Sequence, residues 1–287
     1  MIQSIKDTVT LGNGVKMPGF GFGVWQIPQG VTAESVKMAI KAGYRNIDTA
    51  AAYRNEREVG EGIRQAMEEY GIKREELFVS TKLWNDHRGY ERAKEAIEDS
   101  LEKLNIGYID LYMLHWPAVS KWHRDWREIN ADTWKGAEEY YEKGLIKALG
   151  VANYLAHHVK ALMEDVRIQP MVNQIEYHPG FGQKESAEFC QQHGIAVQAW
   201  SPLGCGEVLQ NKVLKEIASD HGKDTAQICL RWLLQKDIVP LPKSTHEERI
   251  FSNTEVFDFS LSAEEMKRID QIPYCGGMRF DPDAAMS

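Results

Sequence analysis

The sequence has few of the features that mark a secreted, metal-binding or membrane protein. Its four cysteines, Cys190, Cys205, Cys229 and Cys275, form no CxxC pair and no metal-ligand spacing. We therefore expect free thiols, buried as small apolar side chains, in a reducing cytoplasm and no metal site. The opening MIQSIKDTVT lacks the apolar stretch of a secretory signal, and no run approaches the roughly 18 apolar residues of a membrane span.

Positively charged residues are outnumbered by negatively charged ones. The chain carries 34 Lys and Arg against 42 Asp and Glu, a formal net charge of −8. A surface of that sign repels nucleic acid and anionic membranes, so neither is an expected partner. Any site for an anionic ligand must be a local cluster of basic residues. The 287 residues are 43% hydrophobic, which is enough for a large core.

A third absence is the glycine-rich fingerprint of a Rossmann fold. Gly19, Gly21 and Gly23 have the wrong spacing and lead into Val24-Trp25-Gln26, where the helix of such a unit would have to begin. Instead, short apolar runs alternate with helical patterns. The expected strands are Gly19–Gly23, Asn46–Asp48, Leu77–Lys82, Ile109–Leu114, Ile146–Val151, Met171–Ile175, Ala196–Ala199 and Ile238–Pro240.

Helical patterns fill the intervals between these strands. The expected helices are Ala33–Ala42, Glu56–Tyr70 with Asn55 as N-cap, Glu91–Leu104, Ala131–Lys143, Leu155–Met163, Lys184–His193, Val213–His221, Thr225–Gln235 and Thr245–Asn253. Capping boxes are expected at Thr245 with Glu248 and at Ser262 with Glu265, the second one starting a final short helix.

This alternation predicts an α/β fold, a (β/α)8 TIM barrel formed by a single domain over residues 1–287. Eight β/α units in about 250 residues fit a closed barrel, and the alternative is a doubly wound open sheet. An N-terminal β-hairpin precedes the barrel, because Asn13-Gly14 is a type I′ turn signal between apolar residues. Two irregular segments, the loop Pro117–Asn130 and the tail Tyr274–Ser287, are candidates for lids or binding surfaces.

Polar and aromatic groups recur where the predicted strands end, which is where barrel enzymes carry their active sites. After the second, third and fourth strands come Asp48 with Tyr53, then Lys82, then His115. Each of these side chains taken alone is more often packing or an ion pair, but the combination suits proton transfer. We expect Asp48 to hold Lys82 charged, and Lys82 to lower the pKa of Tyr53 so that it can protonate an oxygen.

A second group follows the later strands. Asn153, Gln174 with Glu176, and Trp200 with Ser201 come after the fifth, sixth and seventh strands. Lys243, Ser244 and Arg249 lie at and just inside a predicted helix start, in an otherwise acidic protein, and so indicate a phosphate site. The alternative is that Arg249 pairs with Glu247 or Glu248 on a solvated helix face.

Eight segments in order resemble the signature segments of the aldo-keto reductases, from about residue 8 to about residue 273. They are GFGVW at 21–25, NIDTA at 46–50 with Tyr53, STKLW at 80–84, LHWP at 114–117, GVANY at 150–154, NQIEYHP at 173–179, WSPLG at 200–204, and LPKS at 241–244 followed by Arg249 and Asn253. The short tail and Trp200 resemble the microbial branch that includes diketogluconate and glyoxal reductases.

The resemblance implies an NADPH-dependent carbonyl reductase, often monomeric, that acts on small carbonyl compounds with the tetrad Asp48, Tyr53, Lys82 and His115. NADP(H) would lie extended along the barrel top, with Trp200 stacked on the nicotinamide and its carboxamide held by Asn153 and Gln174. The other implied cofactor residues are Gly23, Val24, Trp25, Ser201, Leu203, Lys243, Ser244, Arg249 and Asn253, and the implied substrate residues are Trp25, Trp84, Trp116 and, as a lid, Trp122. Ala152 departs from the serine of many members, which removes a hydrogen bond to the carboxamide.

Two other functions stay open at this point. One is a non-catalytic NADP(H)-sensing regulatory subunit on the same barrel, which the complete tetrad argues against. The other is a barrel hydrolase or isomerase, but Ser201 lacks a GxSxG context, and His157, His158 and His178 form no recognisable ligand set.

Overall fold

The computed structural model describes residues 2–284. The chain opens with an antiparallel hairpin of β1 (Thr8–Thr10) and β2 (Lys16–Pro18), as expected. The turn is not of type I′, because Gly14 has a φ of 87° but Asn13 does not adopt a positive φ. A longer loop over residues 11–15 connects the strands instead, closed by a 2.8 Å bond from the Leu11 N–H to the Val15 carbonyl.

The barrel strands run parallel in the order β3, β4, β5, β6, β7, β8, β10 and β11, which confirms the predicted TIM barrel. Their bounds are β3 Gly21–Gly23, β4 Asn46–Asp48, β5 Phe78–Leu83, β6 Ile109–Leu114, β7 Ile146–Ala152, β8 Val172–His178, β10 Ala196–Trp200 and β11 Ile238–Pro240. A bond of 3.0 Å from the Gly23 N–H to the Pro242 carbonyl joins the first strand to the segment directly after the last one. The short strand β9 (Phe181–Gly182) pairs antiparallel with β8, outside the barrel.

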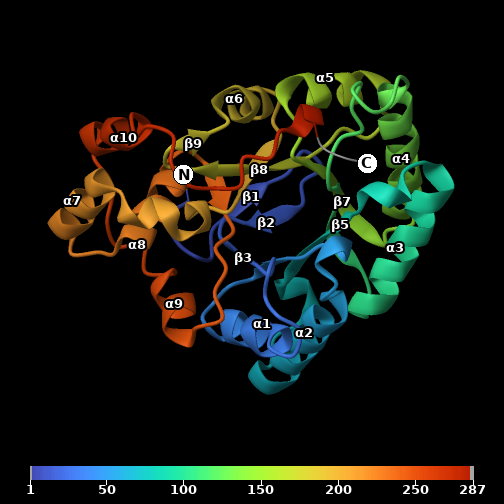
Figure 1. The fold of residues 1–287 in the computed structure, drawn as a ribbon. Coiled ribbons are helices and arrows are strands. Elements are labelled where there is room, and N and C mark those ends of the chain that lie inside the picture. Colours follow the sequence, from blue (N-terminus) through green and yellow to red (C-terminus); the bar gives the residue numbers. More distant parts are fainter. Residues whose placement is uncertain (1, 285–287) are drawn as a thin grey trace.

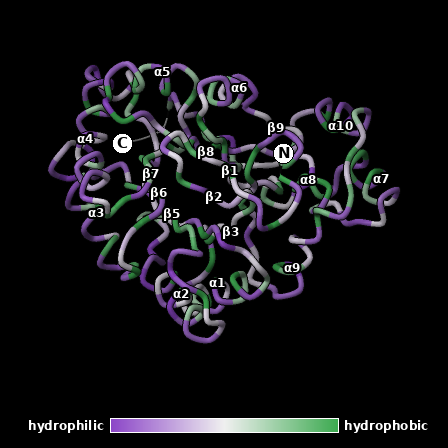
Figure 2. The backbone as a smooth tube through the Cα atoms, turned by 180° about the vertical axis from the view of Figure 1, so that it is seen from behind, coloured by the Kyte–Doolittle hydropathy of each residue, from purple (hydrophilic) through white to green (hydrophobic). Residues whose placement is uncertain are grey.

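The helices form a ring around these strands, as Figure 1 shows. Their bounds are α1 Thr32–Lys41, α2 Glu56–Tyr70, α3 Tyr90–Leu104, α4 Trp126–Glu142, α5 Ala156–Asp165, α6 Lys184–Gln192, α7 Lys212–His221, α8 Thr225–Gln235, α9 Glu247–Ser252 and α10 Ala263–Asp270. Hydrophilic and hydrophobic stretches alternate along them in Figure 2, as amphipathic helices on a sheet require. No helix among residues 2–284 is long and apolar enough to cross a membrane.

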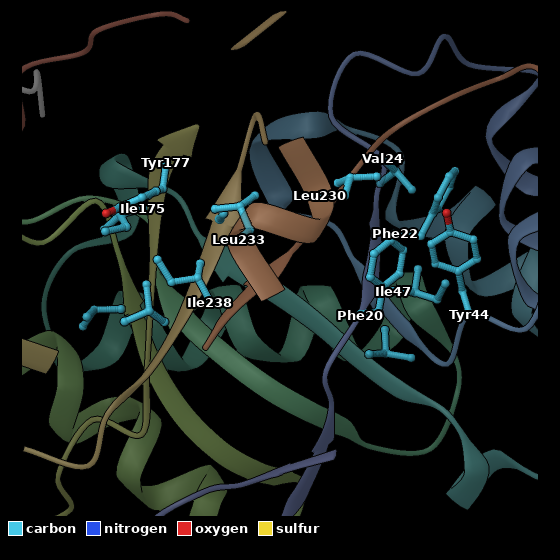
Figure 3. Close-up of a cluster of buried hydrophobic side chains, with 14 of the residues drawn as sticks. Phe20, Phe22, Val24, Tyr44, Ile47, Ile175, Tyr177, Leu230, Leu233 and Ile238 are labelled. Atoms are coloured by element: carbon cyan, nitrogen blue, oxygen red, sulfur yellow. The ribbon is translucent and has the colours of Figure 1, made fainter. Parts of the chain in front are cut away.

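Two hydrophobic layers hold the barrel together. The larger one lies between the strands and the surrounding helices, and Figure 3 shows two parts of it, Phe20, Phe22 and Tyr44 in one and Ile175, Leu233 and Ile238 in the other. The smaller layer fills the barrel interior, and Leu11 and Met17 of the hairpin region belong to it. The hairpin therefore closes the end of the barrel away from the strands' carboxyl ends, and leaves the opposite end open.

Several local predictions were wrong. Helix α4 begins at Trp126, so the loop after β6 is shorter than predicted. Helix α9 begins at Glu247 with His246 as N-cap and no capping side chain, so no Thr245–Glu248 box forms. Asn55 is the N-cap residue of α2, as predicted, although its side chain bonds Val24 and Thr49 and does not cap the helix. The Ser262–Glu265 capping box is confirmed.

The cysteines also differ from the prediction of four buried thiols. Cys190 and Cys229 are buried, but Cys205 is exposed and Cys275 is half-buried. Cys205 lies in a tight turn with a φ of 56°, at a position where the chain passes over the open end of the barrel.

Candidate active site

A cavity of about 1820 Å³ occupies the open end of the barrel, at the carboxyl ends of the strands. It exceeds the roughly 300–1,000 Å³ of ordinary small-molecule pockets. The residues that line it come from every strand end and from the C-terminal tail. The cavity is thus large enough for a dinucleotide together with a small substrate.

Asp48 and Lys82 form a dry ion pair at the base of this cavity. Lys82 is 0% exposed and Asp48 3% exposed, and the lysine Nζ lies 2.9 and 2.7 Å from the two carboxylate oxygens. Ser80 and Gln174 also donate to Asp48 Oδ1, each at 2.8 Å. These bonds compensate the cost of burying the two charges.

Tyr53 lies next to this pair, on the one-turn helix η1 (Ala51–Tyr53) after β4. Its Oη is 3.3 Å from Lys82 Nζ, and its ring lines the cavity. Contrary to our expectation, the pKa of Tyr53 is raised well above its usual value, by burial and then by the charge of Asp48. The bound carboxylate neutralises Lys82, so the lysine does not offset the burial of the phenol. Tyr53 therefore stays protonated at neutral pH, as a proton donor must.

His115 completes the predicted tetrad. Its ring lies edge-on to Tyr53, with the centroids 5.7 Å apart, and edge-on to Trp84 at 5.1 Å. Burial and the charge of Lys82 hold its pKa well below the usual range, so the ring is neutral at pH 7. Nδ1 is buried and has no hydrogen-bond partner among the described atoms. The structure thus brings all four predicted tetrad residues together, with a neutral imidazole beside the phenol.

Trp200 and the amides beside it form the next part of the cavity wall. The indole Nε1 of Trp200 donates to Asn153 Oδ1 at 2.8 Å, and Trp25 lies edge-on to it at 6.0 Å. Asn153 has a φ of 62°, a conformation that asparagine tolerates better than most residues. The amide nitrogen of Gln174 donates to Asp48 and Gln198, which leaves Oε1 as its atom for a ligand. The ring of Trp200 is therefore held in one orientation, with a carbonyl acceptor nearby.

The basic end of the cavity lies at β11 and α9. Lys243 and Arg249 are exposed and line the cavity, and neither forms an ion pair with any of the described residues. Glu247 pairs with Lys41 instead, at 3.4 Å, so the alternative in which Arg249 pairs with Glu247 or Glu248 is wrong. Ser244 and Asn253 are buried and line the same cavity. Ser201 and Leu203, which follow Trp200 in the chain, line it as well.

Most of the other predicted residues line the same cavity, namely Gly23, Trp25, Trp84 and Trp116. Val24 does not, because it is 0% exposed and its backbone N–H and C=O bond Asp48 and Asn55. Trp122 also lies outside the lining, and its indole Nε1 is 3.3 Å from the Ala284 carbonyl of the tail. The assignment of Val24 to the cofactor is therefore wrong. The assignment of Trp122 to the substrate stays a prediction, because Ala284, which its indole contacts, lines the cavity.

Sequence reasoning missed several residues of the site. Ser80 bonds Asp48, and the Thr49 carbonyl accepts from Lys82 at 2.8 Å. Ser80 could have been found, since it precedes Lys82 by two residues on one strand and so faces the same way. Phe280 of the tail also lines the cavity. It carried no signal, because nothing in an irregular segment indicates which way the chain folds back.

The comparisons with known proteins agree with this geometry. The model of the aldo/keto reductase family matches residues 11–273, and the chain belongs to that family. Glyoxal reductase from Bacillus subtilis is 49% identical over 273 residues, 95% of each chain. Methylglyoxal reductase from Escherichia coli is 40% identical over 277 residues, 96% of each. A Bombyx mori aldo-keto reductase solved in complex with NADP is 35% identical, with a TM-score of 0.86 over 95% of this chain and 94% of that one.

The bacterial relatives confirm the resemblance to the microbial glyoxal reductases. Membership of the family also makes the chain an oxidoreductase, which removes the hydrolase and isomerase alternatives.

Proposed function

We propose that the protein reduces aldehydes and ketones to alcohols with NADPH, and that Tyr53 donates the proton. The observation that carries this proposal is the series of hydrogen bonds from Asp48 through Lys82 to the Tyr53 hydroxyl. Tyr53 in turn lines a cavity large enough for cofactor and substrate. The protein is an NADP-dependent oxidoreductase by its family. The role of each residue is part of the proposal.

The cavity fits NADP(H) at both of its ends. Lys243 and Arg249 offer two unpaired cations for the 2′-phosphate, and a phosphate there would form charge-assisted hydrogen bonds. Ser244 and Asn253 lie beside them for the adenosine part. Gly23, Trp25 and Trp200 also line the cavity, and the ring of Trp200 offers a flat surface for the nicotinamide. When bound, the cofactor supplies the hydride.

The residues of this chain would then act on the carbonyl oxygen. Tyr53 and the neutral His115 lie close enough to hydrogen-bond the same oxygen, since their rings are 5.7 Å apart. The phenol would give up its proton as negative charge develops on that oxygen. Lys82 Nζ, 3.3 Å from the Tyr53 hydroxyl, would then donate a hydrogen bond to the phenolate oxygen, and Asp48 together with Ser80 and Gln174 holds this part of the site in place.

The substrate side of the cavity suggests small, uncharged carbonyl compounds. Trp25, Trp84, Trp116 and Phe280 line it, and they offer aromatic surface with few polar groups. The bacterial relatives are named for glyoxal and methylglyoxal, which are small dicarbonyls. We propose small aldehydes and α-dicarbonyls as substrates, and sugar-derived carbonyls as further candidates.

The test is NADPH oxidation by the purified protein against a panel of aldehydes, α-dicarbonyls and keto-sugars, with NADH in parallel. We expect turnover with methylglyoxal or an aryl aldehyde, and a preference for NADPH. Quenching of tryptophan emission by NADPH measures cofactor binding separately. Tight binding without turnover across the panel would contradict the reductase and point to the NADP(H)-sensing subunit.

A further inference from the structure

Glu176 is a buried carboxylate that the proposed chemistry does not use. It lies on β8, two residues beyond Gln174, and is 1% exposed. Its two oxygens accept the backbone N–H groups of Met278 and Arg279, at 2.7 and 3.0 Å. One side chain at a barrel strand end thus binds two consecutive amides of the C-terminal tail, in a geometry that strengthens both bonds.

The tail is shaped for this contact. Gly277 has a φ of 82°, and a Cβ there would lie 2.5 Å from Glu176 Oε1 and 2.4 Å from His178 Nε2. Only glycine allows the backbone to approach the carboxylate so closely. The Gly277 N–H also donates to the Gly204 carbonyl, at 3.2 Å. The position of the tail is therefore fixed by a site that accepts one conformation.

A second tether holds the far end of the tail against α5. Asp283 Oδ1 lies 2.9 Å from His157 Nε2 and 3.0 Å from His158 Nε2. Three such side chains could also suggest a metal site. His158 Nδ1, however, accepts the Leu155 N–H at 3.2 Å, so a neutral ring carries its proton on Nε2, facing Asp283. The cluster is accordingly a set of hydrogen bonds to the tail.

Phe280 lies between the two tethers. Its ring packs edge-on against Trp116, with centroids 5.8 Å apart at 86°, and both rings line the cavity that holds Tyr53. Phe280 is 48% exposed, so packing alone does not fix it. Its position depends on the segments on each side of it, which Glu176 and Asp283 hold.

We propose that Glu176 and Asp283 are positioning residues for the carbonyl substrate, because they hold Phe280 in place as a wall of the pocket. The inference rests on the proposed reductase function. Glu176 fixes the two tail residues directly before Phe280, and Asp283 fixes the tail three residues after it. An aryl substrate, which would contact Phe280, depends on both tethers, whereas methylglyoxal is too small to need that wall.

The test compares Glu176→Gln with Glu138→Gln. Glu138 is a buried carboxylate on α4, and its Oε1 accepts the backbone N–H groups of Arg167 and Ile168 at 3.2 and 2.7 Å. It makes the same kind of contact but does not line the cavity. Each variant replaces a buried carboxylate by a neutral amide. In Glu138→Gln the remaining oxygen can still accept both N–H groups, so this variant controls for the loss of a buried charge. In Glu176→Gln one of the two accepting oxygens becomes an NH2 group, so only this variant releases the tail.

Limited trypsin digestion gives a readout that does not depend on activity. Arg279 is exposed and precedes Phe280, so cleavage there removes the rest of the tail and is detected by mass spectrometry. We expect Glu176→Gln to be cleaved at Arg279 about fivefold to tenfold faster than the wild type, since one of two charge-assisted bonds is lost. Glu138→Gln should be cleaved at the wild-type rate.

Steady-state kinetics give the second readout. In Glu176→Gln the KM for 4-nitrobenzaldehyde should rise about fivefold while its kcat stays within about twofold, because Tyr53 is untouched. The KM for methylglyoxal and the NADPH dissociation constant should stay near the wild-type values. Equal cleavage and equal KM in the two glutamine variants would overturn the proposal, and so would a parallel loss for both substrates.

The experiment still gives a result if the variant does not fold or if the wild type is inactive. If Glu176→Gln does not fold, Asp283→Asn replaces it, with the same direction and a smaller effect because Asp283 is exposed. If the wild type reduces neither carbonyl, the proposed function has failed, and the cleavage rates still decide whether Glu176 holds the tail.

Discussion

The two ends of the cavity are built in opposite ways. At the reacting end, Lys82 and Asp48 are buried and satisfied by each other, by Ser80 and by Gln174. At the basic end, Lys243 and Arg249 are exposed and form no ion pair within residues 2–284. The ion pair at the reacting end is satisfied without a ligand, whereas the cations at the basic end have charge available for one.

This difference follows from what each end has to do. Proton transfer requires groups that are already in place, so that no reorganisation accompanies the reaction. Binding a solvated phosphate requires cations that are accessible and not already neutralised. Substitutions at the reacting end should therefore reduce turnover and stability, whereas those at the basic end should reduce cofactor affinity alone.

The largest effect is expected for Tyr53→Phe. Loss of the phenol removes the proton donor, so kcat should fall by about 10² to 10⁴, while NADPH still quenches tryptophan emission with an unchanged dissociation constant. Tyr154→Phe is the control, since it also loses one buried hydroxyl bond, to Asn130, outside the cavity lining. Full activity in Tyr53→Phe would exclude this residue as the donor.

Next comes the effect of Lys82→Met on stability. Asp48 would keep a buried charge without its partner, which should cost about 3–5 kcal/mol in urea unfolding. Lys243→Met should change the stability by less than about 0.5 kcal/mol, because it removes an exposed unpaired cation. Similar losses in both variants would mean that the two ends are not built differently.

The residues that mark this contrast were predictable to different degrees. Asp48, Lys82 and His115 lie at or just after the ends of three successive strands, so their common position could be predicted from the β/α alternation. Lys243 and Arg249 were found because they lie together at a predicted helix start, in a chain of net negative charge. The protonation state of Tyr53 was not predictable, since the sequence does not show how deeply the phenol is buried or how strongly the charge of Asp48 acts on it.

Other parts of the site depend on contacts between residues far apart in the sequence, which no local sequence pattern indicates. Glu176 appeared as a polar residue at a strand end, but its partners, Met278 and Arg279, lie about a hundred positions away in an irregular tail. Trp122 was predicted as a lid from its place in the loop after the fourth strand. Its indole bonds the Ala284 carbonyl of the tail, a contact between two irregular segments that no local pattern indicates.

Removal of the unpaired cations should have a moderate effect on one cofactor only. Lys243→Ala and Arg249→Ala should each raise the KM for NADPH about tenfold, because a charge-assisted bond to the 2′-phosphate is lost. The KM for NADH, which lacks that phosphate, should barely change. Lys41→Ala is the control. Lys41 lies on α1, outside the cavity lining, and pairs with Glu247 of α9, the helix that carries Arg249. An equal loss for NADH would contradict the assignment of the phosphate site.

The smallest expected effect is a difference in pH dependence between the two ends of the cavity, measured as the KM for NADPH and the turnover number. The pKa of Tyr53 is raised well above its usual value and that of His115 lowered well below its own, so neither group changes protonation between pH 6 and pH 8. In the same range a phosphate takes up its second proton, with a pKa of about 6. Because the cations at the basic end attract the dianion more strongly, the KM for NADPH should rise about twofold to threefold as the pH falls through about 6, and that for NADH should stay constant. The turnover number at saturating NADPH should stay flat over this range, and a fall in it on the acid side would mean that a group at the reacting end titrates there after all.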